Sequence, residues 1–181
     1  GHGWRDWPEK WQSCHYAPAH GKRRLWASRS SRPLTQEHTV SALRPDISVA
    51  VLNQRGQEYL PGCLGIEILS LAPGQLNSRM PIRKLHIAPN EFLHAASVVA
   101  LADTSCGYAT IAHLPPGAQS FTTIELKSNH LGTVTEGAVA CVANAQHLGR
   151  STQVWDAVVS DEASGRTLAL FRCTQMILWP K

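Results

Sequence analysis

The feature that most restricts the fold of this chain is a long apolar stretch from Phe92 to Ala112. Asp103 is the only charged residue between His94 and His113. The stretch is almost long enough to span a bilayer, but a carboxylate at its centre would be costly in lipid. We therefore predict a helix buried within the protein, because a helix that is apolar on all sides is normally covered on all sides.

Shorter segments with the pattern of strands flank this helix. Two precede it, at residues 64–71 and 75–82, and four follow it, at residues 121–128, 137–147, 151–160 and 166–178. The sequence Pro115-Pro116-Gly117 blocks any continuation of the helix. This order predicts an α+β fold, in which an antiparallel sheet carries one long helix on one face.

The N-terminal part of the chain has a different composition. Residues 1–40 hold seven Lys and Arg against three Asp and Glu, whereas residues 41–181 hold ten of each. A basic arm that binds nucleic acid or acidic lipid would fit this excess. We favour an extension that folds weakly onto the domain, and we expect no nucleic-acid partner, because no docking motif accompanies the charges. We divide the chain into an extension, 1–59, and a domain, 60–181, with a short helix plausible in 40–59.

The five cysteines are widely scattered and form no CxxC pair. This spacing argues against a disulfide framework and against a structural zinc site. The N-terminus also lacks the apolar core of a signal peptide. We expect a cytoplasmic protein that binds no metal and does not enter a membrane.

Asp103 has two interpretations. It could be a structural residue whose carboxylate is satisfied by hydrogen bonds within the core. It could equally be a catalytic nucleophile or general base, since burial would raise its proton affinity. Its position alone does not decide between them.

The start of the same helix supplies backbone N–H groups that could also take part in catalysis. The first amide groups, near Ala95 and Ala96, lack acceptors within the helix and can hold an oxyanion. Ala95 and Asp103 are eight residues apart, which is roughly 12 Å along a helix. One reacting carbon cannot touch both within one chain, so their joint action predicts a dimer with composite sites.

The segment HAASVVALADT, residues 94–104, resembles the central-helix motif of hotdog thioesterases. In the phenylacetate-degradation and 4-hydroxybenzoyl-CoA branches this motif reads His-Gly-Gly, six residues, then Asp or Glu. The segments at residues 121–129, 149–157 and 169–178 also look like strands of that branch. The resemblance covers about residues 60–179 and implies a hotdog fold, with the sheet wrapped around one long central helix. It also implies a dimer or tetramer that hydrolyses acyl-CoA without a cofactor.

The resemblance assigns roles to particular residues. Asp103 would attack the thioester or activate water, the Ala95 N–H of the partner subunit would polarise the carbonyl, and His94 would position the site. Expected substrate contacts are Asn90, Ala96, Thr104, Gly107, Arg150 and Ser151, although Thr104 fits core packing equally well. Ala95 and Ala96 replace the two glycines of the motif. Their methyl groups leave less space for a bulky acyl group to approach the start of the helix. An aromatic acyl group, and hence a role in the degradation of aromatic compounds, is suggested only by the resemblance.

Other candidates are weaker. Cys106 could be a nucleophile, but a buried cysteine is more often a small hydrophobe. His130 and His147 lack partners at ligand spacing and fit a polar face or a loop. A non-catalytic acyl-CoA-binding protein and an acyl-CoA hydratase or dehydratase remain as alternatives. The hydratase or dehydratase is disfavoured because His94 and Asp103 stand nine positions apart.

Overall fold

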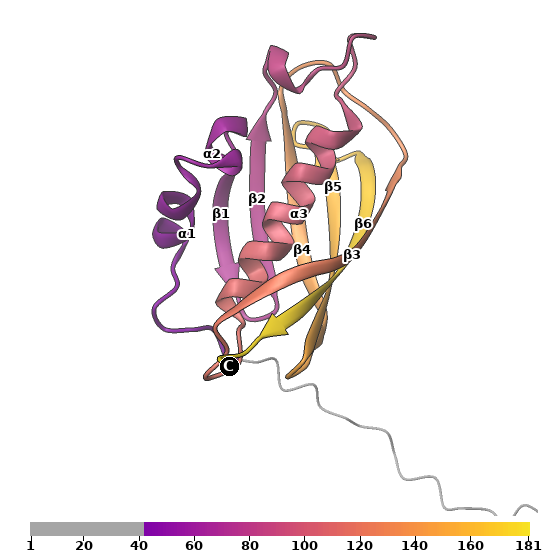
Figure 1. The fold of residues 1–181 in the computed structure, drawn as a ribbon. Helices are drawn as coiled ribbons and strands as arrows, with labels where there is room; N and C mark the ends of the chain where they lie inside the picture. Colours follow the sequence, from indigo (N-terminus) through magenta and orange to yellow (C-terminus); the bar gives the residue numbers. More distant parts are fainter. Residues whose placement is uncertain (1–41) are drawn as a thin grey trace, which may run out of the picture. The chain divides into compact units, whose positions relative to one another are not determined.

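The computed structural model describes residues 42–181, which form one six-stranded antiparallel sheet and one long helix (Figure 1). The strand order is β1-β2-β4-β5-β6-β3, so that β1 and β3 are the two edges. The elements are α1 Val49–Gly56, α2 Leu60–Leu64, β1 Glu67–Ala72, β2 Gln75–Pro81, the short 3-10 helix η1 Lys84–His86, α3 Ala95–Ala112, β3 Ser120–His130, β4 Ala138–Leu148, β5 Thr152–Asp161 and β6 Thr167–Leu178. The predicted α+β class is confirmed.

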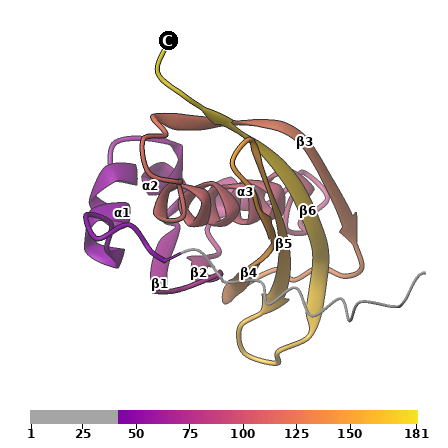
Figure 2. The same ribbon diagram turned by 90° about the horizontal axis from the view of Figure 1, so that it is seen from below.

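The sheet curves around α3, with β3 on one side of the helix and β1 and β2 on another (Figure 2). The core is formed by side chains such as Leu101 and Cys106 of α3, which are fully buried together with Trp155 of β5. Within residues 42–181, α3 is the one helix long and apolar enough to cross a bilayer. Ten of its 18 residues are buried, as expected for the central helix of a folded domain.

The observed elements differ from the predicted ones mainly at their ends. α3 begins at Ala95 rather than Phe92, because His94 is extended and its side chain caps the helix. The strand predicted from residue 64 begins at Glu67, because residues 60–64 form α2. In a sequence pattern, Pro61 and Gly62 suggest an interruption of regular structure. Proline is nevertheless well tolerated in the first turn of a helix, which is where Pro61 lies.

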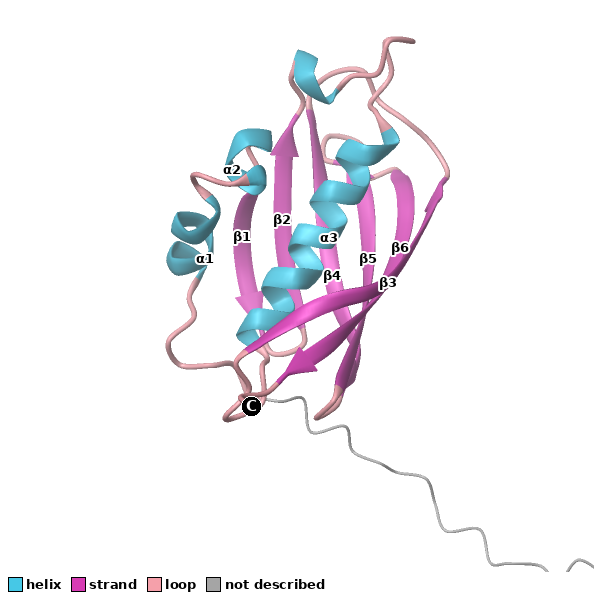
Figure 3. Ribbon diagram, in the orientation of Figure 1, coloured by secondary structure: helices cyan, strands magenta, loops and turns pink. Residues whose placement is uncertain are grey.

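The described part of the predicted extension packs onto the domain. The Ser48 hydroxyl accepts a hydrogen bond from the Val51 N–H and so caps α1, which lies beside the β1 edge (Figure 3). Leu52 is fully buried in the core. The Asn53 side chain bonds to both backbone groups of Ile68, at 2.8 and 3.0 Å. Residues 48–56 therefore pack against β1, and the rest of 42–59 lies outside helices and strands. The expectation of a weakly folded basic leader falls on residues 1–41, outside the described part of the chain.

Candidate active site

Asp103 lies in the middle of α3 and is partly buried. Its Oδ1 is shielded from solvent and has no hydrogen-bond partner among residues 42–181. Burial raises the pKa of this carboxyl group above its ordinary value. A purely structural aspartate would need partners that offset its desolvation, and the described residues supply none to Oδ1. An unpaired and desolvated carboxyl group is typical of a reactive site.

The first turn of α3 has one free backbone donor. The Nδ1 of His94 accepts a hydrogen bond from the Ala96 N–H at 2.9 Å. The carbonyl oxygen of His94 accepts from Ser97 and Val98, at 2.9 and 3.4 Å. The Ala95 N–H has no acceptor among the described residues, and Ala95 is exposed. The donor predicted to polarise a carbonyl is thus accessible, whereas the amide of Ala96 is already occupied.

The start of α3 is held firmly by a buried histidine. The carbonyl oxygen of His86 accepts from the His94 N–H at 2.9 Å and from the Ser97 hydroxyl at 3.0 Å. The Nδ1 of His86 accepts from the Arg83 N–H at 3.0 Å. Burial lowers the pKa of this fully buried imidazole, which favours the neutral form that this acceptor role requires. His86 is a positioning residue that sequence reasoning did not identify.

The turn before the helix contains the predicted contact residue Asn90. Its Oδ1 accepts a hydrogen bond of 3.4 Å from the Phe92 N–H. The next residue, Glu91, has a φ of 67° and is the only non-glycine residue with positive φ in the described part of the chain. Asn90 is exposed, and its side-chain hydrogen bond stabilises the turn that leads to His94.

Gly107 follows Asp103 by one helical turn and is buried. A Cβ atom built on Gly107 would lie 3.1 Å from Cζ of Phe121 and would meet no other residue within 4 Å. Phe121 is half-buried on the edge strand β3. The missing side chain therefore makes room for the Phe121 ring beside the Asp103 face of α3. Thr104, next to Asp103 on the helix, is also half-buried.

Arg150 and Ser151 lie in the exposed turn between β4 and β5. The guanidinium of Arg150 sits 4.6 Å from the centroid of the Trp179 ring, a cation–π contact. The side chain of Gln153 donates to the carbonyl oxygen of His113 at 2.8 Å, so this turn lies near the C-terminal end of α3. His94 and Ala95 are at the other end of the helix. One chain therefore does not bring all the predicted site residues together.

The remaining candidates do not form a second reactive site. Cys106 is fully buried, and a hydrogen bond with Cys173, together with burial, raises its pKa well above the ordinary value. Its thiol is therefore neutral and inaccessible, unlike that of a catalytic cysteine. His130 and His147 are exposed. Within residues 42–181, no group of three or more His, Cys, Asp or Glu side chains could hold a metal ion.

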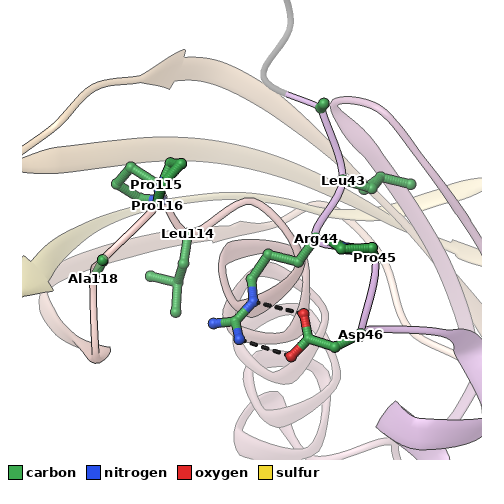
Figure 4. Close-up of a pocket in the computed structure, with 10 residues that line it drawn as sticks. Leu43, Arg44, Pro45, Asp46, Leu114, Pro115, Pro116 and Ala118 are labelled. Atoms are coloured by element: carbon green, nitrogen blue, oxygen red, sulfur yellow. Dashed lines mark hydrogen bonds and ion pairs between the residues drawn. The ribbon is translucent and has the colours of Figure 1, made fainter.

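The structure also has a cavity of about 490 Å³ near the end of α3, lined by residues 42–46 and 114–118 (Figure 4). Arg44 and Asp46 face each other there in a two-pronged ion pair, with N–O distances of 3.0 and 2.7 Å. The charges of this pair are therefore already matched. None of the predicted site residues lines this cavity, and Asp103 lines none of three other surface cavities.

The sequence and the fold resemble those of known proteins. Residues 90–168 match the family model described as thioesterase superfamily. The chain is 31% identical to the 1,4-dihydroxy-2-naphthoyl-CoA hydrolase of Escherichia coli over 132 residues, covering 73% of this chain and 96% of that enzyme. It is also 31% identical to the proofreading thioesterase EntH of Klebsiella pneumoniae, covering 69% of this chain and 90% of the relative.

A solved structure supports the same comparison. The crystal structure of a mutant of the thioesterase PA1618 from Pseudomonas aeruginosa superposes with a TM-score of 0.72 at 28% identity. The match covers 76% of this chain and 99% of that chain. The hotdog fold expected from the helix motif is thereby confirmed.

Proposed function

Because this chain belongs to the thioesterase superfamily and is a thioester hydrolase, we propose that it cleaves an acyl-CoA into a carboxylic acid and free coenzyme A, with Asp103 as its catalytic carboxylate. The observation that carries this proposal is the state of Asp103. Its Oδ1 is buried without a hydrogen-bond partner among the described residues, on a helix that is otherwise uncharged between two histidines. Such a carboxylate is a usable nucleophile or general base.

Asp103 could cleave the thioester by two routes. In the first, an Asp103 oxygen bonds to the thioester carbon, the C–S bond breaks, and the coenzyme A thiolate leaves and takes a proton; water then hydrolyses the mixed anhydride. In the second, Asp103 takes a proton from water as the water oxygen bonds to the same carbon; the C–S bond then breaks, and the coenzyme A thiolate takes the proton from Asp103. In both routes the carbonyl oxygen becomes negative, and a backbone N–H such as that of Ala95 stabilises it. His94 holds the first turn of the helix in place through the Ala96 N–H.

The catalytic groups would come from two subunits. Asp103 and Ala95 are roughly 12 Å apart along one helix, so a second copy has to bring its own helix start to Asp103. Strand β3 is an 11-residue edge that exposes Ile124 and Leu126, by 53% and 45%. Long apolar edges are rarely left unpaired. We propose a two-fold dimer in which the two β3 edges pair and continue the sheet, with two composite sites, and further pairing of dimers into a tetramer.

An aromatic acyl group is the substrate class that we favour. The support is the name of one relative, a hydrolase of 1,4-dihydroxy-2-naphthoyl-CoA, and the Phe121 ring beside the Asp103 face of the helix. Arg150 and Ser151 would contact the coenzyme A phosphates, because a guanidinium pairs well with phosphate oxygens. A cytoplasmic location and the absence of a cofactor stay predictions.

The first experiment is thiol release from short, medium, long and aromatic acyl-CoAs, with wild type and Asp103→Asn side by side. An enzyme-only blank is needed because Cys63 is exposed and would react with the thiol reagent. We expect release by the wild type and a loss of about 10²-fold or more in Asp103→Asn. Near-normal activity in the variant would show that Asp103 is structural. Acyl-CoA binding without release by the wild type would favour the binding-protein alternative.

The second experiment isolates the Ala95 N–H. Ala95→Pro removes only this donor, because Ala95 is the first helical residue and proline is favoured there. The φ of −67° and ψ of 135° at His94 also suit a residue before proline. Ala95→Gly keeps the N–H and is the matched control. We expect Ala95→Pro to fold and lose turnover, and Ala95→Gly to keep it.

Mixing the two inactive variants tests the composite site. A mixed dimer of Asp103→Asn and Ala95→Pro contains one intact site if each site uses both subunits. Random exchange in an equal mixture would then restore about a quarter of the sites. If each site lies within one subunit, both protomers of the mixed dimer are defective, and no activity returns.

A further inference from the structure

The C-terminal tryptophan lies where three segments of the chain meet. Trp179 follows the last residue of β6 and is half-buried. The backbone just before it is held on two sides. The Leu178 carbonyl oxygen accepts a hydrogen bond from the Gln119 N–H at 2.8 Å, and the Ile177 N–H donates to the Ser151 carbonyl oxygen at 2.9 Å. The end of β6 is therefore tied both to the loop after α3 and to the turn between β4 and β5.

Trp179 holds Arg150 through two contacts. The Nε1 of Trp179 donates to the Arg150 carbonyl oxygen at 3.3 Å, and the centroid of its ring lies 4.6 Å from the guanidinium carbon. The ring itself is placed against Gly117, where a Cβ atom would lie 3.6 Å from the Cζ3 of Trp179. An exposed arginine normally samples many rotamers. Arg150 is exposed, yet both its main chain and the end of its side chain are held by one residue.

The guanidinium of Arg150 keeps its hydrogen-bonding capacity. Within residues 42–181 this side chain forms no ion pair and donates no hydrogen bond. Three other arginines pair with carboxylates, namely Arg44, Arg79 and Arg172. An aromatic ring contacts a guanidinium through its face and leaves the N–H donors in its plane free for oxygen acceptors. Arg150 therefore offers unused donors in a fixed position.

The surroundings of Arg150 favour an anion. The three segments that meet here contain Arg150 and Lys181 but no Asp or Glu. They are residues 113–124, 146–155 and 173–181. The carboxylate of Asp46, which lines the cavity beside residues 114–118, is matched by the guanidinium of Arg44. An excess of positive charge on one surface raises the local concentration of anions.

The distance from Asp103 to this turn suits one substrate molecule. His113 follows Asp103 by ten residues, which is roughly 15 Å along a helix. The turn that holds Arg150 lies near this end of α3, because Gln153 donates to the His113 carbonyl oxygen. The bonds between the sulfur and the first phosphate of coenzyme A extend about as far as four extended residues, or roughly 15 Å. A thioester at Asp103 therefore places its phosphates within reach of Arg150.

We propose that Trp179 is a positioning residue, which holds the Arg150 guanidinium in place for the phosphates of coenzyme A. The ring restricts the side chain before the substrate arrives, so less conformational entropy is lost when a phosphate binds. Trp179 acts through Arg150 and touches no reacting atom, so it contributes to binding and not to the cleavage of the C–S bond. The inference rests on the proposed function and deepens it, because it names the residue that organises the phosphate end of the site.

The test measures kcat and KM of the wild type, Trp179→Leu and Trp179→Phe. The substrates are the best acyl-CoA of the thiol-release panel and the pantetheine thioester of the same acid, which has no phosphate. Trp179→Leu should raise KM for the acyl-CoA about three- to five-fold, as expected for the loss of an exposed cation–π contact, and should leave kcat unchanged. Trp179→Phe keeps an aromatic face and should retain most of the affinity. Neither variant should change KM for the pantetheine thioester.

A double-mutant cycle shows whether Trp179 acts through Arg150. Arg150→Met removes the guanidinium, so adding Trp179→Leu to it should raise KM for the acyl-CoA no further. A full additional loss in the double variant would overturn the inference, as would equal losses on the acyl-CoA and the pantetheine thioester in Trp179→Leu. If Trp179→Leu does not fold, Arg150→Lys tests the same contact, because it keeps the charge and loses the planar group. An unchanged KM in Arg150→Lys would then overturn the inference.

Binding of free coenzyme A, measured by calorimetry, separates failure of this inference from failure of the proposed function. If the wild type hydrolyses acyl-CoAs and Trp179→Leu binds coenzyme A as tightly as the wild type, the role of Trp179 is wrong and the hydrolase stands. If no acyl-CoA is hydrolysed, the proposed function fails. Weaker binding of coenzyme A by Trp179→Leu would still uphold the role of Trp179, and equal binding would sink it as well.

Discussion

The imidazole of His113 accepts a hydrogen bond from the Gly74 N–H, with 2.8 Å between the Nε2 of His113 and the backbone nitrogen. This bond ties the turn between β1 and β2 to the end of α3. The Nδ1 of the same ring lies 2.7 Å from the Ala109 carbonyl oxygen, which can only accept. Nδ1 therefore carries the proton, and His113 is neutral. Its ring also packs edge-on against Trp155, with centroids 5.2 Å apart.

Protonation of His113 should destabilise the fold. Burial lowers the pKa of this histidine in the folded state, whereas its unfolded value is about 6.5. Its stabilising contribution is therefore present above about pH 6.5 and is lost as the pH falls through the lower folded value. We expect urea midpoints to fall from pH 8 to pH 5. His113→Phe should be less stable at pH 8, by about 1–3 kcal/mol, and less sensitive to acid. An equal acid sensitivity of wild type and variant would contradict this assignment.

Asp103 should reduce stability while it supports activity. Its pKa is raised in the folded state by burial, so its contribution favours folding at low pH and is lost as the pH rises through the folded value. Asp103→Asn should therefore melt at a higher temperature than the wild type at pH 7, with the difference shrinking toward pH 4. Thermal unfolding of both proteins across this range is the measurement. A lower melting temperature of the variant at pH 7 would indicate a structural aspartate.

Glycine at position 91 should stabilise the protein. Glu91 has a φ of 67°, a conformation that disfavours side chains with a Cβ atom. We expect Glu91→Gly to raise the free energy of unfolding by about 1 kcal/mol, measured by guanidinium denaturation. Asn90→Gly is the matched control, and it should be destabilising because Asn90 has no positive φ and its side chain braces the turn. Equal effects of the two changes would argue against strain at Glu91.

A methyl group at position 107 should disturb the acyl side of the site. The new Cβ would lie 3.1 Å from the Phe121 ring, so the ring has to shift. Alanine also favours helix over glycine by about 1 kcal/mol, so we expect Gly107→Ala to fold normally but to lose catalytic efficiency on aromatic acyl-CoAs. Adding Phe121→Leu to this variant should restore part of the space beside position 107 that the methyl group fills. Full activity of Gly107→Ala on all substrates would show that this contact does not shape the pocket.

Much of the fold follows from patterns that are readable along the chain. The apolar helix around Asp103 and the alternating strands after it are set by local periodicity, and their order restricts the architecture. α2 was not predicted, because Pro61 and Gly62 read as a break although they start and continue a short helix. α1 was only plausible, since Leu52 is its single large buried side chain and leaves a weak pattern.

The sequence names candidate site residues, but it does not show the state of their side chains in the folded protein. The spacing from His94 to Asp103 points to a known motif, but the missing partner of the Asp103 Oδ1 depends on how distant strands pack. His86 and His113 look like ordinary polar residues until the contacts of their rings are known.

The free donor at the start of α3 belongs to the main chain of Ala95, so it does not depend on which side chain that position carries. Every amino acid except proline would preserve it. If this donor polarises the thioester carbonyl as proposed, mutations at position 95 would change the space beside it and leave the donor in place. A lineage of such enzymes could drift between acyl groups of different bulk at this position without passing through an inactive ancestor.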